Sequence, residues 1–162
     1  MKVIVSDSSP IRSLYFLRLL SILPELFGEV VIPPAVLHEL ETPASGLTPI
    51  PRSELGVLSV VAPNDQSKVQ ELQSVLDKGE SEALVLAIEL GVSIILMDET
   101  RGRAMARRLG LSALGVIGIF IKAKRANMIG EIKPLLLRLR SENNFYISDA
   151  LMRDALTSVG EQ

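Results

Sequence analysis

The first hundred residues of the chain contain four acids beside strongly apolar sequence: Asp7, Glu39, Glu82 and Asp98. Carboxylates that crowd together raise one another's pKa values unless a cation neutralises them. Mg²⁺ and Mn²⁺ prefer oxygen ligands, retain several water molecules, and need neither Cys nor His. If the fold gathers these acids, they predict a site for one of these hard divalent ions.

A divalent ion held by carboxylates supports the hydrolysis of phosphodiester bonds. It activates water near neutral pH and polarises a phosphoryl oxygen, and two ions about 3.5–4 Å apart can brace the attacking and leaving oxygens. The chain has no Cys and a single His, which excludes disulfides, thiol nucleophiles and Cys-ligated metal centres. That His38 points roughly 100° away from Glu39 around a helix, so we expect it on the helix surface. Water is therefore the expected nucleophile.

The elements that position these acids are apolar strands that alternate with helices. Strands are predicted at residues 3–6, 30–32, 57–61, 92–97 and 112–114, with helices between them and no hairpin signals. The hydrophobic fraction of 48% and the mean hydropathy of +0.34 suit a sheet that is covered on both faces. The pattern predicts an α/β fold, a three-layer α/β/α sandwich around a central, mostly parallel sheet.

Two of the predicted strands end on carboxylates. Asp7 follows the first strand, and Asp98 follows the strand over residues 92–97. Ligands of open parallel sheets bind beyond the carboxyl ends of the strands. If these two strands are neighbours, both side chains emerge at one edge of the sheet.

Turn chemistry offers a second interpretation of Asp7, because Asp commonly forms turns and caps helices. Ser9 is predicted to be the N-cap and Pro10 the first residue of the next helix, so the turn does not require Asp7. Ser8 and Ser9 are expected to be caps rather than nucleophiles, because no His or Lys is placed to activate them.

The other three acids have structural alternatives as well. Glu39 could be a solvated residue of an amphipathic helix. Glu80 and Glu82 both suit the positive N-terminal end of the next helix, and of the two we predict Glu82 to be the ligand. Asp98 could cap the helix that follows it, but Thr100 is available for that role.

The length of 162 residues predicts one domain, residues 1–162, which buries roughly 70% of its unfolded surface. Residues 42–56 are rich in Pro, Gly, Ser and Thr, which predicts a loop or an exposed insertion. Residues 131–162 are expected to form C-terminal helices packed on the same domain. No signal-type segment or 18-residue apolar run is evident, so we expect a cytoplasmic protein without a membrane span.

Charge is unevenly distributed along the chain. The first hundred residues hold 6 Lys/Arg and 14 Asp/Glu, and the remainder holds 11 and 5. Arg101, Arg103 and Arg107 follow shortly after Asp98, and the last two share a helix face from which they could grip a phosphate backbone. A solvated helix face is the alternative. With only 4% aromatic residues, recognition of RNA by base stacking has little support in the sequence.

The ordered motifs SDSSP, PPAVLHELET, GESEALVLAIELG, IILMDETRGRAMARRLGL and FYISDALMRDAL cover nearly the whole chain. Together they resemble the PIN-domain nucleases, and are most similar to a prokaryotic branch related to VapC-type toxins. The resemblance implies a PIN-like fold and a Mg²⁺- or Mn²⁺-dependent ribonuclease. Asp7, Glu39, Glu82 and Asp98 match the family's acids, with Asp7, Glu82 and Asp98 expected to hold the metal and Glu39 to assist.

The same resemblance bears on substrate and partners. Ser8 or Ser9 matches the small hydroxyl residue beside the first acid, and we expect both, with the arginines after Asp98, to contact RNA. The family analogy further implies the toxin of a toxin–antitoxin pair, neutralised by a small antitoxin protein. The apolar C-terminal helices could serve a homodimer, although core packing explains them as well.

One departure from the family pattern leaves the number of metals open. Many family members have a further Asp two positions beyond Asp98, where this chain has Thr100. Glu99 is the neighbouring substitute, and Asp149 is an outside candidate. The departure favours a rival interpretation, a PIN-like module that binds RNA or protein without cleaving it. A nucleotide-binding regulatory domain fits less well, because no Gly-rich loop follows the first strand.

Overall fold

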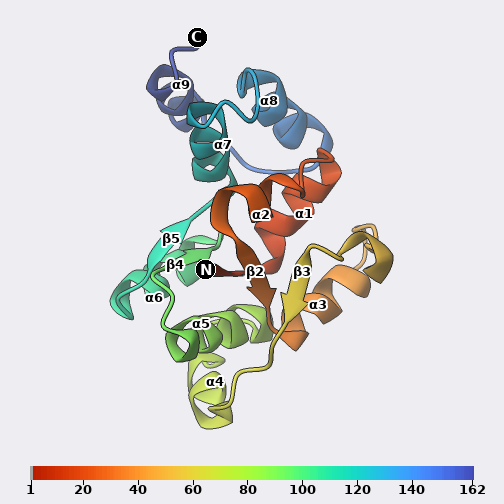
Figure 1. The fold of residues 1–162 in the computed structure, drawn as a ribbon, viewed down its shortest axis with the longest axis vertical. Coiled ribbons are helices and arrows are strands. Elements are labelled where there is room, and N and C mark those ends of the chain that lie inside the picture. Colours follow the sequence, from red (N-terminus) through yellow and green to blue (C-terminus); the bar gives the residue numbers. More distant parts are fainter. Residues whose placement is uncertain (1) are drawn as a thin grey trace.

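The computed structural model describes residues 2–162. Its elements, in chain order, are β1 (Val3–Ser6), α1 (Ser8–Phe16), α2 (Ile22–Phe27), β2 (Glu29–Ile32), α3 (Pro34–Glu41), the 3₁₀ turn η1 (Arg52–Glu54), β3 (Leu58–Val60), α4 (Gln66–Leu72), α5 (Lys78–Leu90), β4 (Ile94–Leu96), α6 (Thr100–Arg108), β5 (Ser112–Leu114), α7 (Val116–Arg125), α8 (Lys133–Glu142) and α9 (Asp149–Ser158). Figure 1 shows the strands between helices on both sides.

Within residues 2–162, five strands form one sheet in the order β3-β2-β1-β4-β5, and every neighbouring pair is parallel. In the centre, Val5 of β1 pairs with Val31 of β2 on one side and with Ile95 of β4 on the other. The chain adds β2 and β3 on one side of β1, then crosses to the other side for β4 and β5. The order of the strands therefore reverses between β1 and β4, the point at which open α/β sheets bind ligands.

Alternate strand residues supply two separate cores. Ile4 and Leu96 face the core that includes residues of α1, α2 and α7–α9, whereas Val5 and Ile95 face the core formed with α4, α5 and α6. This alternation follows from the two-residue period of a strand. The predicted three-layer α/β/α sandwich with a parallel sheet is confirmed.

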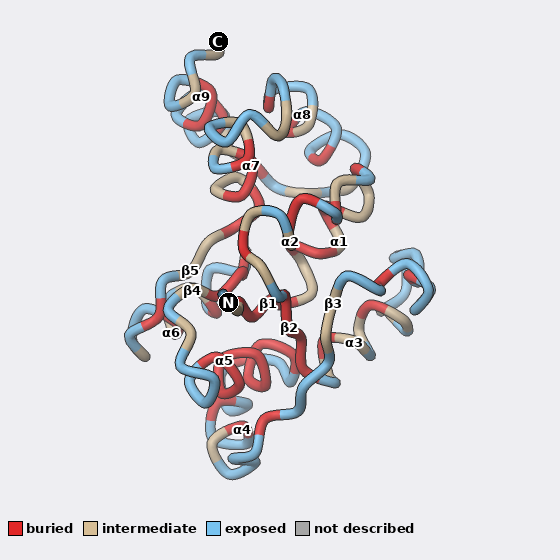
Figure 2. Tube along the Cα trace, in the orientation of Figure 1, coloured by how far each residue is buried: buried red, intermediate tan, exposed pale blue. Residues whose placement is uncertain are grey.

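Helix α5 is buried over most of its length, as its nearly continuous red trace in Figure 2 shows. It begins at Lys78, and Asp77 and Glu80 form a capping box at its N-terminus. It ends at Gly91, which adopts the left-handed conformation with φ of +67°. Glu80 lies in the first turn of α5, and Glu82 lies in the second.

The strands are shorter than the apolar runs that predicted them. β4 covers only Ile94–Leu96, although Met97 beyond it is fully buried and its amide donates to the Leu114 carbonyl at 3.0 Å. The apolar sequence thus continues past the end of β4, because Met97, which begins the next turn, is buried as well.

The loop predicted over residues 42–56 is irregular and largely exposed, but it is not a free insertion. Ile50 and Leu55 are buried in the first core, and the Ile50 amide donates to the Leu40 carbonyl at 2.9 Å. Helices α7, α8 and α9 group at one end of the molecule and contribute to that same core (Figure 1). None of the helices in residues 2–162 has the length and apolar character needed to cross a bilayer.

Candidate active site

Asp7 lies at the carboxyl end of β1, at the reversal point of the sheet. Its backbone amide donates to the Leu96 carbonyl at 2.8 Å, which ties it to β4. Its side chain is 3% exposed, and its Oδ1 atom is buried without a hydrogen-bond partner among the residues described. A buried carboxylate oxygen with no partner is costly unless a ligand or ion satisfies it.

The prediction that Ser9 caps α1 is wrong. The helix begins at Ser8, so Asp7 occupies the N-cap position, yet its side chain makes no capping hydrogen bond. Pro10 therefore lies at the third helical position and not at the first. The reason for singling out Asp7 nevertheless holds, because its carboxylate is not used to close the turn.

Other acids surround Asp7 and affect its protonation. Burial raises the pKa of Asp7 well above its ordinary value, and the Ser8 amide offsets part of this rise. The negative charges of Glu39, Glu80 and Asp77 raise it further. Asp7 and these acids come from three different segments of the chain, and the fold brings them close enough to interact electrostatically.

Glu39 reaches this group from α3. The Ser8 hydroxyl donates to Glu39 Oε2 at 2.8 Å. The other side of the carboxylate faces Gly79 in the first turn of α5, where a Cβ atom would collide with it. Burial raises the pKa of Glu39, the Ser8 hydrogen bond opposes the rise, and Asp77 adds to it. Glycine at position 79 thus allows Glu39 to approach the N-terminus of α5.

Glu80 is a candidate ligand that the sequence interpretation ranked below Glu82. Its amide donates to Asp77 Oδ1 at 2.7 Å, and its own Oε1 accepts from the Asp77 amide at 3.2 Å. Its Oε2 is buried without a partner in the described structure, against Gly102, where a side chain would clash. Burial raises the pKa of Glu80 to about 7. The sequence signal was the Asp-x-x-Glu capping box, which places Glu80 in the first helical turn.

Glu82 has a different partner. Its Oε1 accepts a hydrogen bond from the Ala35 amide at 3.0 Å, in the first turn of α3, and its side chain is buried. Glu82 therefore satisfies a free N–H at the start of α3 and joins this helix to α5. Its role as a metal ligand stays a prediction.

Asp98 follows β4 and is held from two sides. Its Oδ1 accepts from the Val116 amide, the first residue of α7, at 2.9 Å, and its Oδ2 faces the Ser9 hydroxyl at 3.4 Å. Burial raises its pKa to about 6, although the Val116 amide and the charge of Arg103 oppose the rise. Thr100 does not cap α6 as predicted; Glu99 occupies that position without a capping hydrogen bond.

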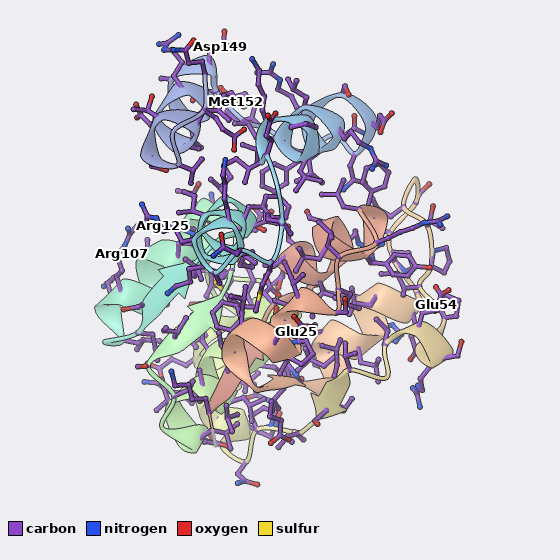
Figure 3. The ribbon with its side chains drawn as sticks, turned by 45° about the horizontal axis from the view of Figure 1, so that its top comes forward. Glu25, Glu54, Arg107, Arg125, Asp149 and Met152 are labelled. Atoms are coloured by element: carbon purple, nitrogen blue, oxygen red, sulfur yellow. The ribbon has the colours of Figure 1, made fainter. Side chains whose placement is uncertain are left out.

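The three arginines after Asp98 do not act as one surface. Arg103 is half-buried and donates to the Met97 carbonyl at 3.1 Å, and its positive charge opposes the rise in the pKa of Asp98. Arg101 and Arg107 are exposed, and Figure 3 shows Arg107 at the outer margin of the molecule. Their contact with RNA stays a prediction.

A pocket of about 380 Å³ opens beside Asp98. Its lining combines α1, the loop after α3, the turn between β4 and α6, and the segment before α9: Ser9, Arg12, Ser13, Leu47, Asp98, Glu99, Thr100, Asn143, Asn144, Phe145 and Tyr146. Sequence reasoning did not identify Arg12, which donates to the Thr48 and Glu39 carbonyls at 2.9 and 3.1 Å. Asp149 is outside the pocket: it is exposed on α9, where Figure 3 labels it, and pairs with Arg140 at 3.1 Å.

The residues present fit a hard divalent ion. In the part of the chain that the structure describes, no three His, Cys, Asp or Glu side chains already converge at coordinating geometry. Mg²⁺ does not require this, because it is commonly bound by one or two carboxylates and keeps several waters. Among the residues described, Asp7 Oδ1 and Glu80 Oε2 are the buried side-chain oxygens left without a partner, and both are of the ligand type that the ion prefers.

The fold and the site define an α/β protein whose acids gather at the reversal point of a parallel sheet. Residues 3–161 match the family DUF3368, which is described as a PIN domain. The chain therefore belongs to the PIN-domain family, whose members are generally nucleases that typically use divalent metals. No curated protein matches the chain at a significant level.

Proposed function

We propose that the chain is a Mg²⁺- or Mn²⁺-dependent ribonuclease, with Asp7, Glu80 and Asp98 contributing to the metal site. The observation that carries this proposal is the pair of buried oxygens without partners, Asp7 Oδ1 and Glu80 Oε2, in a PIN domain. Carboxylates with raised pKa values that cluster at a sheet edge are typical of functional sites. A bound divalent ion would compensate their mutual repulsion.

When bound, a divalent ion supplies activation of water and charge neutralisation at the phosphoryl group. The chain's own residues prepare the site for it. The Ser8 hydroxyl orients Glu39 and the Val116 amide orients Asp98, so neither carboxylate is free to turn away. The Arg103 guanidinium beside Asp98 adds positive charge at the edge where a phosphate would approach.

RNA as the substrate is supported by the family and by the basic residues that begin three positions after Asp98. A role as the toxin of a toxin–antitoxin pair, with a small antitoxin protein as partner, is a further proposal that rests on family analogy. The alternative is a PIN domain that binds RNA or protein without cleaving it. Thr100 favours it, because this hydroxyl residue lines the pocket where many relatives have an acid.

The proposal is tested by incubating the purified protein with a labelled single-stranded RNA in Mg²⁺, in Mn²⁺ and in EDTA. Cleavage is expected with either metal and is expected to stop in EDTA. A matched single-stranded DNA measures the preference for RNA. Metal-independent cleavage, or RNA binding without any cleavage, would contradict the proposal, and the second result would establish the non-cleaving alternative.

Matched glutamine substitutions are expected to separate Glu80 from Glu82. Glu80→Gln removes a charge beside Asp7, and cleavage should fall by about 10- to 100-fold, as is common when groups around a metal are altered. Glu82→Gln keeps an oxygen that accepts from Ala35, so we expect its cleavage rate to stay within a few-fold of wild type. Glu25→Gln, on the exposed face of α2 (Figure 3), is the control.

Rates of metal-dependent RNA cleavage and melting temperatures are measured together for these variants. The assignment of Glu80 fails if Glu82→Gln loses activity while Glu80→Gln retains it. That result would instead support Glu82 as the metal ligand.

A further inference from the structure

The outer wall of the pocket beside Asp98 carries an unusually exposed aromatic side chain. Tyr146 is 85% exposed, the largest value among the exposed large hydrophobic residues that the structure describes. It lines the same pocket as Asp98 and Ser9, although it lies 48 positions beyond Asp98 in the sequence. Single exposed apolar residues are normal on protein surfaces, so its position on this wall matters more than its exposure.

The backbone on both sides of Tyr146 is anchored. The Phe145 amide donates to the Leu139 carbonyl at 3.0 Å, and the Ile147 side chain is buried in the core with 3% exposure. Ser148 then caps α9 by accepting from the Leu151 amide at 3.1 Å. The tyrosine ring is therefore presented from a fixed backbone, and a ring with two side-chain torsions loses little entropy when it is covered.

The same wall also offers groups that can form hydrogen bonds. Asn143 and Asn144 line the pocket, and each carries a side-chain amide. A free amide can both donate and accept, which matches the mixed donors and acceptors on the edge of a nucleobase. Across the pocket, Ser9 and Asp98 belong to the proposed catalytic edge.

We propose that this pocket is a nucleobase subsite in which an unpaired base of the RNA stacks on the Tyr146 ring. Asn143 or Asn144 would then contact the base edge, and the sugar–phosphate would lie toward Asp98. The inference rests on the proposed function and deepens it. The volume of about 380 Å³ falls within the range of pockets for small ligands. A base held in a duplex cannot stack there, because its faces are already covered.

The chain provides an optical probe for this contact. It has no Trp and two Tyr residues, so Tyr15→Phe leaves Tyr146 as the single source of tyrosine fluorescence, and Tyr146→Phe leaves Tyr15. Tyr15 donates to Glu54 and does not line the pocket. Both changes are made in an Asp7→Asn chain in EDTA, so RNA is not consumed during the titration.

The probe is single-stranded hexaadenylate, compared with a six-residue sugar–phosphate strand that lacks bases. We expect hexaadenylate to quench the fluorescence of the chain that retains Tyr146 and not that of the chain that retains Tyr15. The abasic strand should bind at least about 10-fold more weakly, the loss expected when one base–aromatic stack is removed. The Kd of each strand is read separately, from the fluorescence anisotropy of a dye attached to its end. Tyr146→Ala should raise the Kd for hexaadenylate to a similar extent, whereas Tyr146→Phe should preserve it.

Equal binding by Tyr146→Ala and its parent, or equal binding of both strands, would overturn the subsite. Because the assay needs neither metal nor cleavage, it is independent of the proposed activity. A chain that stacks RNA on Tyr146 but never cleaves it supports the subsite and refutes the nuclease. A chain that cleaves RNA with an unchanged KM in Tyr146→Ala refutes the subsite alone.

Discussion

Asp7→Asn is expected to lower metal-dependent RNA cleavage by more than about 100-fold, above the range usual for residues that only surround a metal site. Asparagine nearly matches aspartate in size but removes the charge that would attract the ion. The measurement is the initial rate of cleavage at saturating Mn²⁺. Asp154→Asn, an exposed position on α9 that lies outside the pocket, is the matched control and should retain the wild-type rate.

The same substitution is expected to raise the melting temperature of the metal-free protein at pH 8. Burial and the surrounding acids raise the pKa of Asp7, so its ionisation at this pH opposes folding. A neutral side chain removes that penalty. Loss of activity with a gain in stability is the pattern of a functional residue, whereas a drop in both would assign Asp7 a structural role.

The second large effect is a loss of stability of the metal-free protein as the pH rises. We expect the metal-free protein to be more stable near pH 5 than near pH 8. Burial raises the pKa of Glu80 to about 7 and that of Asp98 to about 6, and raises that of Asp7 as well. In the unfolded chain these groups ionise near pH 4. Between the pKa values of the unfolded and the folded chain, the folded state binds more protons than the unfolded state. The free energy of unfolding therefore falls as the pH rises.

Mn²⁺ should oppose this loss. A divalent ion binds the ionised carboxylates of the folded state, so it should raise the melting temperature at pH 8 by an amount that grows with its concentration. Near pH 5 protons compete, and the gain should be small. Glu41 and Glu161 have lowered pKa values, so their contribution to stability is lost only as the pH falls below the ordinary pKa of glutamate. They therefore do not affect the change expected between pH 5 and pH 8.

Melting curves between pH 5 and pH 8, with and without Mn²⁺, check this pair of expectations. Asp7→Asn should flatten the pH dependence of the metal-free protein and reduce the gain from Mn²⁺. A metal-free protein that becomes more stable from pH 5 to pH 8, or a gain from Mn²⁺ that does not depend on pH, would contradict the assignment of these acids.

The layers of the fold and the strand ends could be predicted from the sequence because both follow from local patterns. Apolar runs that alternate with helical spacing indicate parallel strands, and Asp7 and Asp98 come directly after two such runs. The pairing of β1 with β4 was only a condition in the sequence argument. It depends on crossovers between distant segments, and the structure shows that the condition holds.

The partners of individual side chains could not be predicted in the same way. Ser8 and Ser9 were expected to be caps, but α1 begins two residues earlier than predicted, and Ser8 binds Glu39 while Ser9 faces Asp98. Successive side chains of an α-helix point about 100° apart, so the exact start of a helix decides which groups each side chain can reach. Such a shift is within the ordinary uncertainty of helix boundaries.

The roles of Glu80 and Tyr146 show two different reasons for a missed residue. Glu80 had a local signal, because Asp77 and Glu80 have the spacing of a capping box. Tyr146 had none, because the segment before α9 meets α1 only in the folded chain. The low aromatic content argued against base stacking, whereas the proposed subsite needs only the one tyrosine ring that the fold places in the pocket with Asp98.

The most direct test of the central claim is a crystal structure of the protein grown with Mn²⁺, with diffraction recorded for anomalous scattering from manganese. An anomalous peak is expected at the carboxyl ends of β1 and β4, in contact with the Asp7 carboxylate and with Glu80 or Asp98. The same crystals of Asp7→Asn should lack the peak or show it much weaker. A manganese peak elsewhere on the protein, with none beside Asp7, would contradict the claim that this edge of the sheet is a metal-dependent active site.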